Sequence, residues 1–278
     1  MAISNFIPTI WSENLLTSLD KQYIGVANCN REFEGEIKSR GSSVKICGVG
    51  DISIGDYVKD TDMSSPQDLS DTVAELVIDR AKYFNFQVDD IDRTQCNPKL
   101  LDAAMKNAAA ALANEADKHI FSLYEQAGST VLFYSDVDSD LMDKILEARE
   151  TLFKNGVLNN DDIVFEVSPF VATKLFKDLS ERLSYNNELN DTGYIGTVAG
   201  CKVYVSNNVY YDGGSVVSHK CFMRSKRAIA FAEQLSEVEA YRPEKRFADA
   251  VKGLHLYGAK VVYPNEFVCL DVQYRIDD

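Results

Sequence analysis

The chain has 278 residues, of which 45% are hydrophobic, enough for a sizeable core in one large or two modest domains. Its 29 basic and 43 acidic residues give a formal net charge of −14, which argues against a general nucleic-acid binder, because such proteins carry a basic face. The charge does not exclude a protein that merely encloses nucleic acid, since an acidic wall would not grip it.

The six cysteines lie far apart and form no CxxC pair, which predicts free and mostly buried thiols in a reducing compartment. A disulfide or zinc framework is the alternative for Cys29, Cys47, Cys96, Cys201, Cys221 and Cys269. The first residues, MAISNFIPTIW, do not resemble a signal peptide, and no segment is long enough for a transmembrane helix. We therefore expect a soluble cytoplasmic protein with no membrane partner.

The first ninety residues predict two protruding elements. Residues 1–30 are apolar, with a short helical pattern from Trp11 to Lys21, and we expect an arm that docks on its own core or on a neighbouring subunit. Residues 31–92 mostly alternate apolar and polar side chains, with a turn at 39–42 and a loop at 63–71. This pattern predicts a long β-hairpin, which requires a partner surface because an isolated hairpin is barely stable.

The clearest helix of the chain is predicted from Asn97 to Gly128. Asn97 suits the N-cap and Pro98 the first helical position, and Gly128 stands where a left-handed C-terminal residue is expected. The apolar stripe consists of Leu101, Met105, Ala108, Leu112, Ala116, Ile120 and Tyr124. About thirty residues at ~1.5 Å rise give a rod of roughly 45 Å, which predicts a structural spine.

The rest of the chain alternates short apolar strands with amphipathic helices, as expected for a compact α/β unit followed by strands. The expected elements are strands at 130–134, 163–167, 201–205, 221–223 and 228–231, helices at 141–154 and 169–179, a loop at 180–192, a tight turn at 212–214 and a strand-rich stretch at 238–272.

Three possible chemical sites have ordinary structural interpretations. The acidic run 136–140 partly resembles a calcium loop, but Leu141 replaces the required glycine, so capping of the following helix is favoured. The carboxylates at 89–92 have only Arg93 as a neighbouring charged partner and are interpreted as a solvated junction. The histidines, at positions 119, 219 and 255, show no metal-ligand spacing.

No nucleophile elbow, phosphate-binding loop or dinucleotide fingerprint is present in the sequence, so we expect neither an enzyme nor a bound cofactor or metal. The short basic clusters suit ion pairs between subunits better than a phosphate track. They comprise Lys226 and Arg227, and then Arg242, Lys245 and Arg246.

The order of these elements resembles the tailed-phage major capsid proteins, which have the Hong Kong 97-type fold. The resemblance rests on AKYFNFQVDDID at 81–92, similar to the return strand of the family's extended hairpin, and on several stretches similar to its C-terminal region. These are AIAFAEQ at 228–234, VEAYRP at 238–243, FADAVKG at 247–253, His255, and YGAKV at 257–261.

The resemblance implies an α+β protein that assembles as hexamers and pentamers into the icosahedral shell around the double-stranded DNA of a tailed phage. It implies no sequence-specific DNA binding, and assembly in the host bacterial cytoplasm with a portal and a separate scaffolding protein as partners. It divides the chain into an N-terminal arm (1–30), an extended loop (31–92), a peripheral domain with the spine helix (93–134), an axial domain (135–231) and peripheral strands (232–278).

Candidate contacts between subunits lie on the protruding elements and on the basic clusters. They are Trp11, Lys38, Arg40, Lys45, Arg242, Lys245 and Arg246. Some family members join subunits through an isopeptide bond, for which Lys38 or Lys45 could pair with Asn265, but ordinary solvated lysines are the favoured interpretation.

Two other functions are weighed against the capsid interpretation. An encapsulin-like shell, which encloses enzymes in place of DNA, shares the fold and differs in its C-terminal stretch. An acidic cytoplasmic hydrolase would need Asp89, Asp90 and His119 to converge in one pocket.

Overall fold

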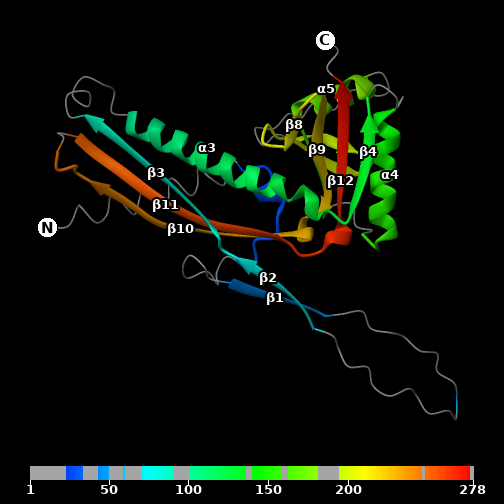
Figure 1. Ribbon diagram of the computed structural model, residues 1–278, viewed down its shortest axis with the longest axis horizontal. Helices are drawn as coiled ribbons and strands as arrows, with labels where there is room; N and C mark the ends of the chain where they lie inside the picture. Colours follow the sequence, from blue (N-terminus) through cyan, green and yellow to red (C-terminus); the bar gives the residue numbers. More distant parts are fainter. Residues whose placement is uncertain are drawn as a thin grey trace.

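The computed structural model describes residues 23–33, 43–49, 59, 71–89, 100–135, 140–157, 162–180, 194–245 and 248–275. They form an α+β protein with two halves, a wide sheet flanked by helices and a narrow sheet beneath one long helix (Figure 1). Among the described residues no helix is long and apolar enough to cross a membrane.

The first half is a seven-stranded mixed sheet in the order β4, β12, β9, β5, β7, β6, with β8 added on β9. Its strands are β4 (Ser129–Tyr134), β5 (Ile163–Val167), β6 (Tyr194–Val198), β7 (Cys201–Val205), β8 (Tyr211–Gly213), β9 (Val216–Ser225) and β12 (Phe267–Arg275). The β4–β12 and β5–β7 pairs are parallel, and the other pairs are antiparallel.

Two helices, α4 (Leu141–Lys154) and α5 (Pro169–Ser180), cover one face of this sheet (Figure 1). On edge strand β4, Val131 and Phe133 point into that covered face and are buried, whereas Leu132 and Tyr134 on the opposite face are exposed. The alternation arises because successive side chains of a strand point to opposite faces.

The second half is a three-stranded antiparallel sheet in the order β10 (Ile229–Tyr241), β11 (Ala248–Val261) and β3 (Arg80–Asp89). Helix α3 (Leu100–Phe121) runs along one face of it (Figure 1). The end of α3 reaches the seven-stranded sheet, where the Phe121 ring lies 5.3 Å from the Phe222 ring of β9. The helix therefore spans both halves, as the predicted spine requires.

A two-stranded ribbon, β1 (Ser43–Val49) paired with β2 (Asp71–Val77), forms the described part of the predicted hairpin. Val44 and Ile46 are buried while Ser43 and Lys45 are exposed, which confirms the alternation read from the sequence. The turn predicted at 39–42 and the loop predicted at 63–71 lie outside the described residues, apart from Asp71 at the start of β2.

The predicted return strand needs a correction. Residues 80–89 form β3, which pairs with β11 and not with β1, so this stretch belongs to the three-stranded sheet. The alternation of apolar and polar side chains predicts a strand but not its partner, because pairing depends on tertiary contacts. The chain passes from one sheet to the other at Ile78 and Asp79, and the hydrophobic pattern of the sequence does not mark this change. The carboxylates at 90–92 lie outside the described residues.

The predicted helix is confirmed over 100–121, but its end differs from the expectation. The chain tightens into a 3₁₀ turn (Ser122–Gln126), and Gly128 is not among the glycines with positive φ. Glycine is required there for another reason, since a Cβ atom on Gly128 would lie 2.4 Å from the Pro264 carbonyl oxygen. The predicted cap at Asn97 and Pro98 lies outside the described residues.

The other expected helices and strands are confirmed, but the strands expected at 221–223 and 228–231 are longer than predicted, since β9 and β10 run 216–225 and 229–241. Helix α4 has the predicted bounds and is capped by the Asp140 carboxylate, which accepts from the Met142 amide at 2.9 Å. The turn expected at 212–214 falls instead at 214–215, because 211–213 pair with β9. Three further 3₁₀ turns are Val26–Asn28, Lys226–Ala228 and Pro264–Glu266. The helical pattern at 11–21 lies outside the described residues, as does the predicted loop at 181–192 beyond the end of α5.

Candidate interaction surfaces

The segment 23–31 fills the junction between the two halves. Its backbone amides at Ile24 and Val26 each donate to the Asp117 carboxylate of α3 at 3.0 Å. Burial raises the pKa of Asp117, and these amides work in the opposite direction. The part of the arm that the structure describes is therefore docked on its own core.

Arg224 and Glu166 form a fully buried ion pair at this junction. The side chains of both residues are 0% exposed, and the guanidinium donates to the carboxylate through Nε at 3.1 Å and Nη2 at 3.0 Å. Arg224 also donates to the carbonyls of Asn28 and Gly25, at 2.7 and 3.1 Å. Burial works to lower the pKa of Arg224, but the Glu166 carboxylate outweighs it and raises that pKa.

A second polar cluster holds the same segment against the three-stranded sheet. The Glu233 carboxylate of β10 accepts from the Tyr23 hydroxyl and from Arg31 at 2.6 Å, and it lies 2.8 Å from Nε2 of His255. Burial works to raise the pKa of Glu233, but the contacts with His255, Tyr23 and Arg31 outweigh it, so the pKa is lowered. The segment 23–31 is thus held to both sheets and to α3.

The base of the hairpin ribbon packs on the face of the three-stranded sheet opposite α3. Leu76 and Ile78 are both fully buried there, together with Val44 and Ile46 of β1. The sheet contributes Ala230, Ala232 and Leu256 to this contact.

Beyond the ribbon the same face of the sheet is open. Tyr83 of β3 and Leu254 of β11 stand directly opposite each other in the register and are 78% and 38% exposed. Side chains that are directly opposite on neighbouring strands lie in contact range, so Tyr83 and Leu254 form one continuous apolar patch. Next to it, Lys252 pairs with Glu239 at 2.7 Å, and the Asn85 amide contacts the Tyr241 hydroxyl at 3.1 Å. We call these six residues the open sheet face.

The predicted contact residues do not form one cluster. Lys45 is exposed on the ribbon base, whereas Arg242 and Lys245 are exposed in the connection between β10 and β11, at the opposite end of β10 from Ala230 and Ala232. Trp11, Lys38, Arg40 and Arg246 lie outside the described residues. Asn265, the possible cross-link acceptor, is exposed in the 3₁₀ turn before β12.

The histidines take three different structural positions. The His119 ring lies 5.7 Å from the Tyr257 ring in a tilted arrangement, and burial lowers the pKa of its imidazole. His255 contacts Glu233, as described above. His219 stands in β9, and burial lowers the pKa of its imidazole as well.

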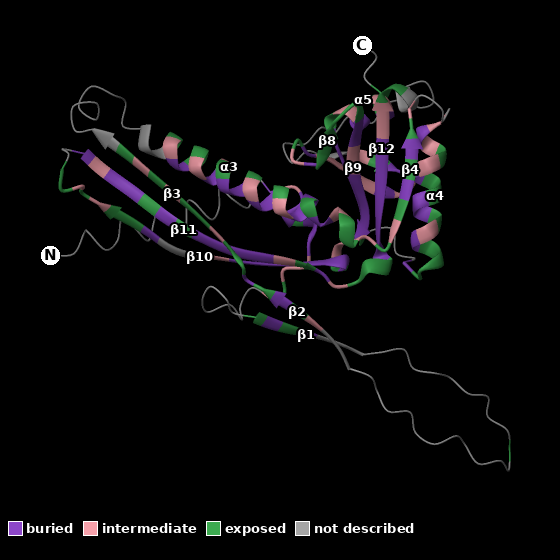
Figure 2. Ribbon diagram, viewed as in Figure 1, coloured by how far each residue is buried: buried purple, intermediate pink, exposed green. Residues whose placement is uncertain are grey.

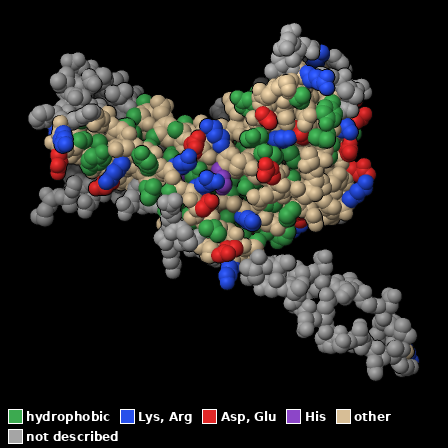
Figure 3. Space-filling model, in the orientation of Figure 1, with side chains coloured by type: hydrophobic (Ala, Val, Ile, Leu, Met, Phe, Trp, Pro, Cys, Tyr) green, Lys and Arg blue, Asp and Glu red, His purple; other side chains and the backbone are tan. Residues whose placement is uncertain are grey.

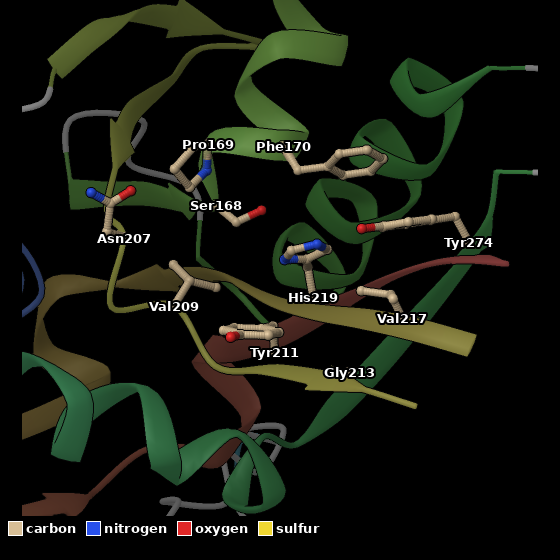
Figure 4. A pocket seen from close by; sticks show the side chains of 10 residues that line it. All are labelled: Ser168, Pro169, Phe170, Asn207, Val209, Tyr211, Gly213, Val217, His219 and Tyr274. Carbon is tan, nitrogen blue, oxygen red and sulfur yellow. The ribbon is translucent and has the colours of Figure 1, made fainter. Parts of the chain in front are cut away.

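His219 lines a cavity of about 420 Å³ between β8, β9 and the start of α5 (Figure 4). Its ring stacks 5.3 Å from that of Phe170 and 5.9 Å from that of Tyr274, and neither ring nitrogen has a hydrogen-bond partner among the described residues. The lining contains no carboxylate, lysine or second histidine, and its other titratable groups are the phenols of Tyr211 and Tyr274. No group of three or more histidine, cysteine or acidic residues in the described part of the chain is placed to hold a metal ion.

The sequence did not reveal the junction residues Arg224, Glu166, Asn28, Asp117 and Glu233. A signal was present for the ion pair, because Glu166 interrupts the apolar strand IVFEV and Arg224 follows the apolar residues CFM. A charge inside a strand that is otherwise apolar indicates a buried partner, since an unpaired buried charge is very unfavourable. The identity of that partner depends on the fold.

No family model and no curated protein matches the sequence. Among solved structures, a chain of Mycobacterium phage Che8 is 30% identical, with a TM-score of 0.70, and the match covers 90% of this chain and 91% of that one. A chain of the capsid of cyanophage P-SCSP1u is 15% identical with a TM-score of 0.66, and the match covers 85% and 84% of the two chains. A chain of Gordonia phage Cozz is also 15% identical, with a TM-score of 0.65 and coverage of 90% and 86%.

Proposed function

The chain belongs to the major capsid proteins of tailed phages, with the Hong Kong 97-type fold, and from this membership we propose how its surfaces build the shell. Its function is structural: it self-assembles into the icosahedral shell of the virion. The structures named above come from phages, and none of them points to an encapsulin-like shell or to a hydrolase.

The observation that carries the assembly mechanism is the one-sided anchorage of the hairpin. The described ribbon base is buried against the sheet at Leu76 and Ile78, while the ribbon points away from the body (Figure 1). A two-stranded ribbon has too little core for independent stability and leaves unpaired backbone edges. We therefore assign the hairpin to contacts with a neighbouring copy, with Lys45 as a candidate contact.

The open sheet face is a second proposed contact between copies. Its pair Tyr83 and Leu254 continues the apolar surface that the ribbon base covers, and aromatic side chains dominate the energetics of protein interfaces. Arg242 and Lys245, exposed at the far end of the same sheet, are the proposed polar rim of this contact. Trp11, Lys38, Arg40 and Arg246 remain candidates on sequence grounds.

We propose the domain division given by the family resemblance: an arm (1–30), an extended loop (31–92), a peripheral domain (93–134 and 232–278) and an axial domain (135–231). In this scheme the peripheral domain contains α3, most of β10, and β11, and β3 extends their sheet although it precedes residue 93. The same bounds include β4 and β12, which lie in the seven-stranded sheet.

We further propose that the shell encloses double-stranded DNA without sequence-specific binding. The net charge of −14 supports weak contact with DNA, and on the face seen in Figure 3 acidic and basic side chains are interspersed. We also propose that a separate scaffolding protein and a portal are partners of this chain, and that assembly takes place in the host cytoplasm.

Electron microscopy of the expressed protein tests the function. We expect closed shells or free capsomers, and a single monomer band after the particles are boiled in denaturant, because we do not expect cross-linking between Lys45 or Lys38 and Asn265. A chain that stays monomeric at high concentration would contradict the assembly mechanism, and a ladder of covalent multimers would contradict the absence of cross-links.

A further inference from the structure

The point where the hairpin leaves the body is unusually tight. Strand β2 ends at Val77 and β3 begins at Arg80, so the chain crosses β11 between these residues. At the crossing, a Cβ atom on Gly258 would lie 2.2 Å from the Val77 carbonyl oxygen and 3.1 Å from the Ile78 Cα. Only a residue without a side chain allows the backbone of β2 to come this close.

The surroundings of Gly258 are shaped for the same approach. Gly258 pairs in register with Ala232 of β10, and Ala230 lies two residues earlier on the same face. These small residues leave room for Leu76 and Ile78, which fill the space and are fully buried. The contact therefore fixes the position and the tilt of the ribbon base.

We propose that Gly258 is a positioning residue for assembly: it sets the direction in which the hairpin leaves the body toward a neighbouring copy. A small change of angle at the base of the hairpin produces a large displacement of residues farther along it. Ten residues of chain span at most roughly 33 Å, so a tilt of about 10° at the base displaces the far end by up to about 6 Å. Interfaces that are packed to the density of protein interiors do not tolerate such a displacement.

This inference rests on the proposed assembly function, and its test compares two substitutions in the same strand. Gly258→Ala places a methyl group against the backbone of β2. Gly253→Ala is the matched control, because its Cβ atom would lie 2.3 Å from a ring carbon of Phe84, on the α3 side of the sheet and away from the hairpin. A side-chain ring can move, whereas the crossing backbone cannot move without the hairpin.

Both variants and the natural chain are assembled at equal concentration after thermal unfolding has shown that the subunits are folded. We expect Gly258→Ala to give at least about tenfold fewer closed shells, or shells of altered diameter, by electron microscopy and sedimentation. Gly253→Ala is expected to give normal shells. Normal shells from Gly258→Ala overturn the inference, and so does an equal loss in both variants. Failure of the natural chain to assemble overturns the proposed function and this inference with it.

If Gly258→Ala does not fold, truncation of the anchor provides the test. Leu76→Ala loosens the ribbon base, whereas Leu152→Ala removes an equally buried leucine from α4 in the other half. We expect irregular or incomplete particles from Leu76→Ala alone, with both chains unfolding at similarly reduced temperatures. Regular shells from both variants, or the same defect in both, overturn the inference.

Discussion

The two halves of the molecule bury their residues very differently. In the seven-stranded half, β5 is buried along its whole length, and buried residues run along β9 and β12 (Figure 2). In the three-stranded half a single helix covers one face, and the other face leaves Tyr83 78% exposed beyond the ribbon base. Among the described residues the first half carries an extensive core of its own, whereas the second leaves an apolar surface that we propose a neighbouring subunit covers.

The segment 23–31 connects these halves through two different polar clusters. The Arg224–Glu166 pair on the wide sheet is completely enclosed, whereas the Glu233 cluster on the narrow sheet includes Arg31, whose side chain remains 31% exposed. The comparison indicates that the enclosed pair is the more sensitive of the two clusters to the loss of one partner, because a charge that cannot reach water depends entirely on its partner.

Substitution of Arg224 by alanine should have the largest effect. It leaves the Glu166 carboxylate buried without its cation, which typically reduces the free energy of unfolding by about 3–5 kcal/mol. Urea denaturation of unassembled subunits measures the change. The double substitution Arg224→Met with Glu166→Leu is the control, and it should recover part of the loss, because no charge is left unpaired although the carbonyls of Asn28 and Gly25 still lose their donor. If Arg224→Ala lowered the free energy of unfolding by less than about 1 kcal/mol, the difference proposed between the two clusters would be contradicted.

Substitution of Glu233 by glutamine should have a smaller effect, about 1–3 kcal/mol, because the charged partner that it leaves, Arg31, is 31% exposed and can be solvated by water. Since the pKa of Glu233 is lowered from 4.5, its ionised form stabilises the fold above that value, and this contribution disappears as the pH falls through the lowered pKa.

The free energy of unfolding is therefore measured between pH 6 and pH 3 for both chains. The difference between the natural chain and Glu233→Gln should be largest at pH 6 and should shrink as the pH falls toward 3. Taking the difference removes the contribution of Asp117, whose raised pKa acts in the opposite direction. A difference that does not vary with pH would contradict the role assigned to the carboxylate.

Substitution of Tyr83 by serine should change stability least, within about 0.5 kcal/mol, because the side chain is mostly in solvent. It should nevertheless lower the yield of shells, since Tyr83 is proposed to be covered by another subunit. Tyr211→Ser is the matched control, because Tyr211 is 63% exposed on β8 of the other half. Equal shell yields from the two variants would show that the open sheet face is not a contact.

Local sequence signals determined the individual elements of this protein. The apolar period and the Asp140 cap gave α4 its bounds, and the alternation of Val44 and Ile46 indicated β1. These signals are local because helical periodicity, capping and strand alternation depend on neighbours within a few residues. The order of the elements and several similar stretches further indicated the family and its fold.

Only the tertiary structure decided which elements meet. It paired β3 with β11, joined Arg224 to Glu166 across 58 positions of the chain, and brought Val77 onto Gly258. It also gave Gly128 a different role, since that glycine accommodates the Pro264 carbonyl instead of ending a helix in the left-handed region. A glycine, or a charge within an apolar strand, indicates in the sequence that another group of the protein lies close to that residue. Which group this is depends on packing between segments that are distant in the chain.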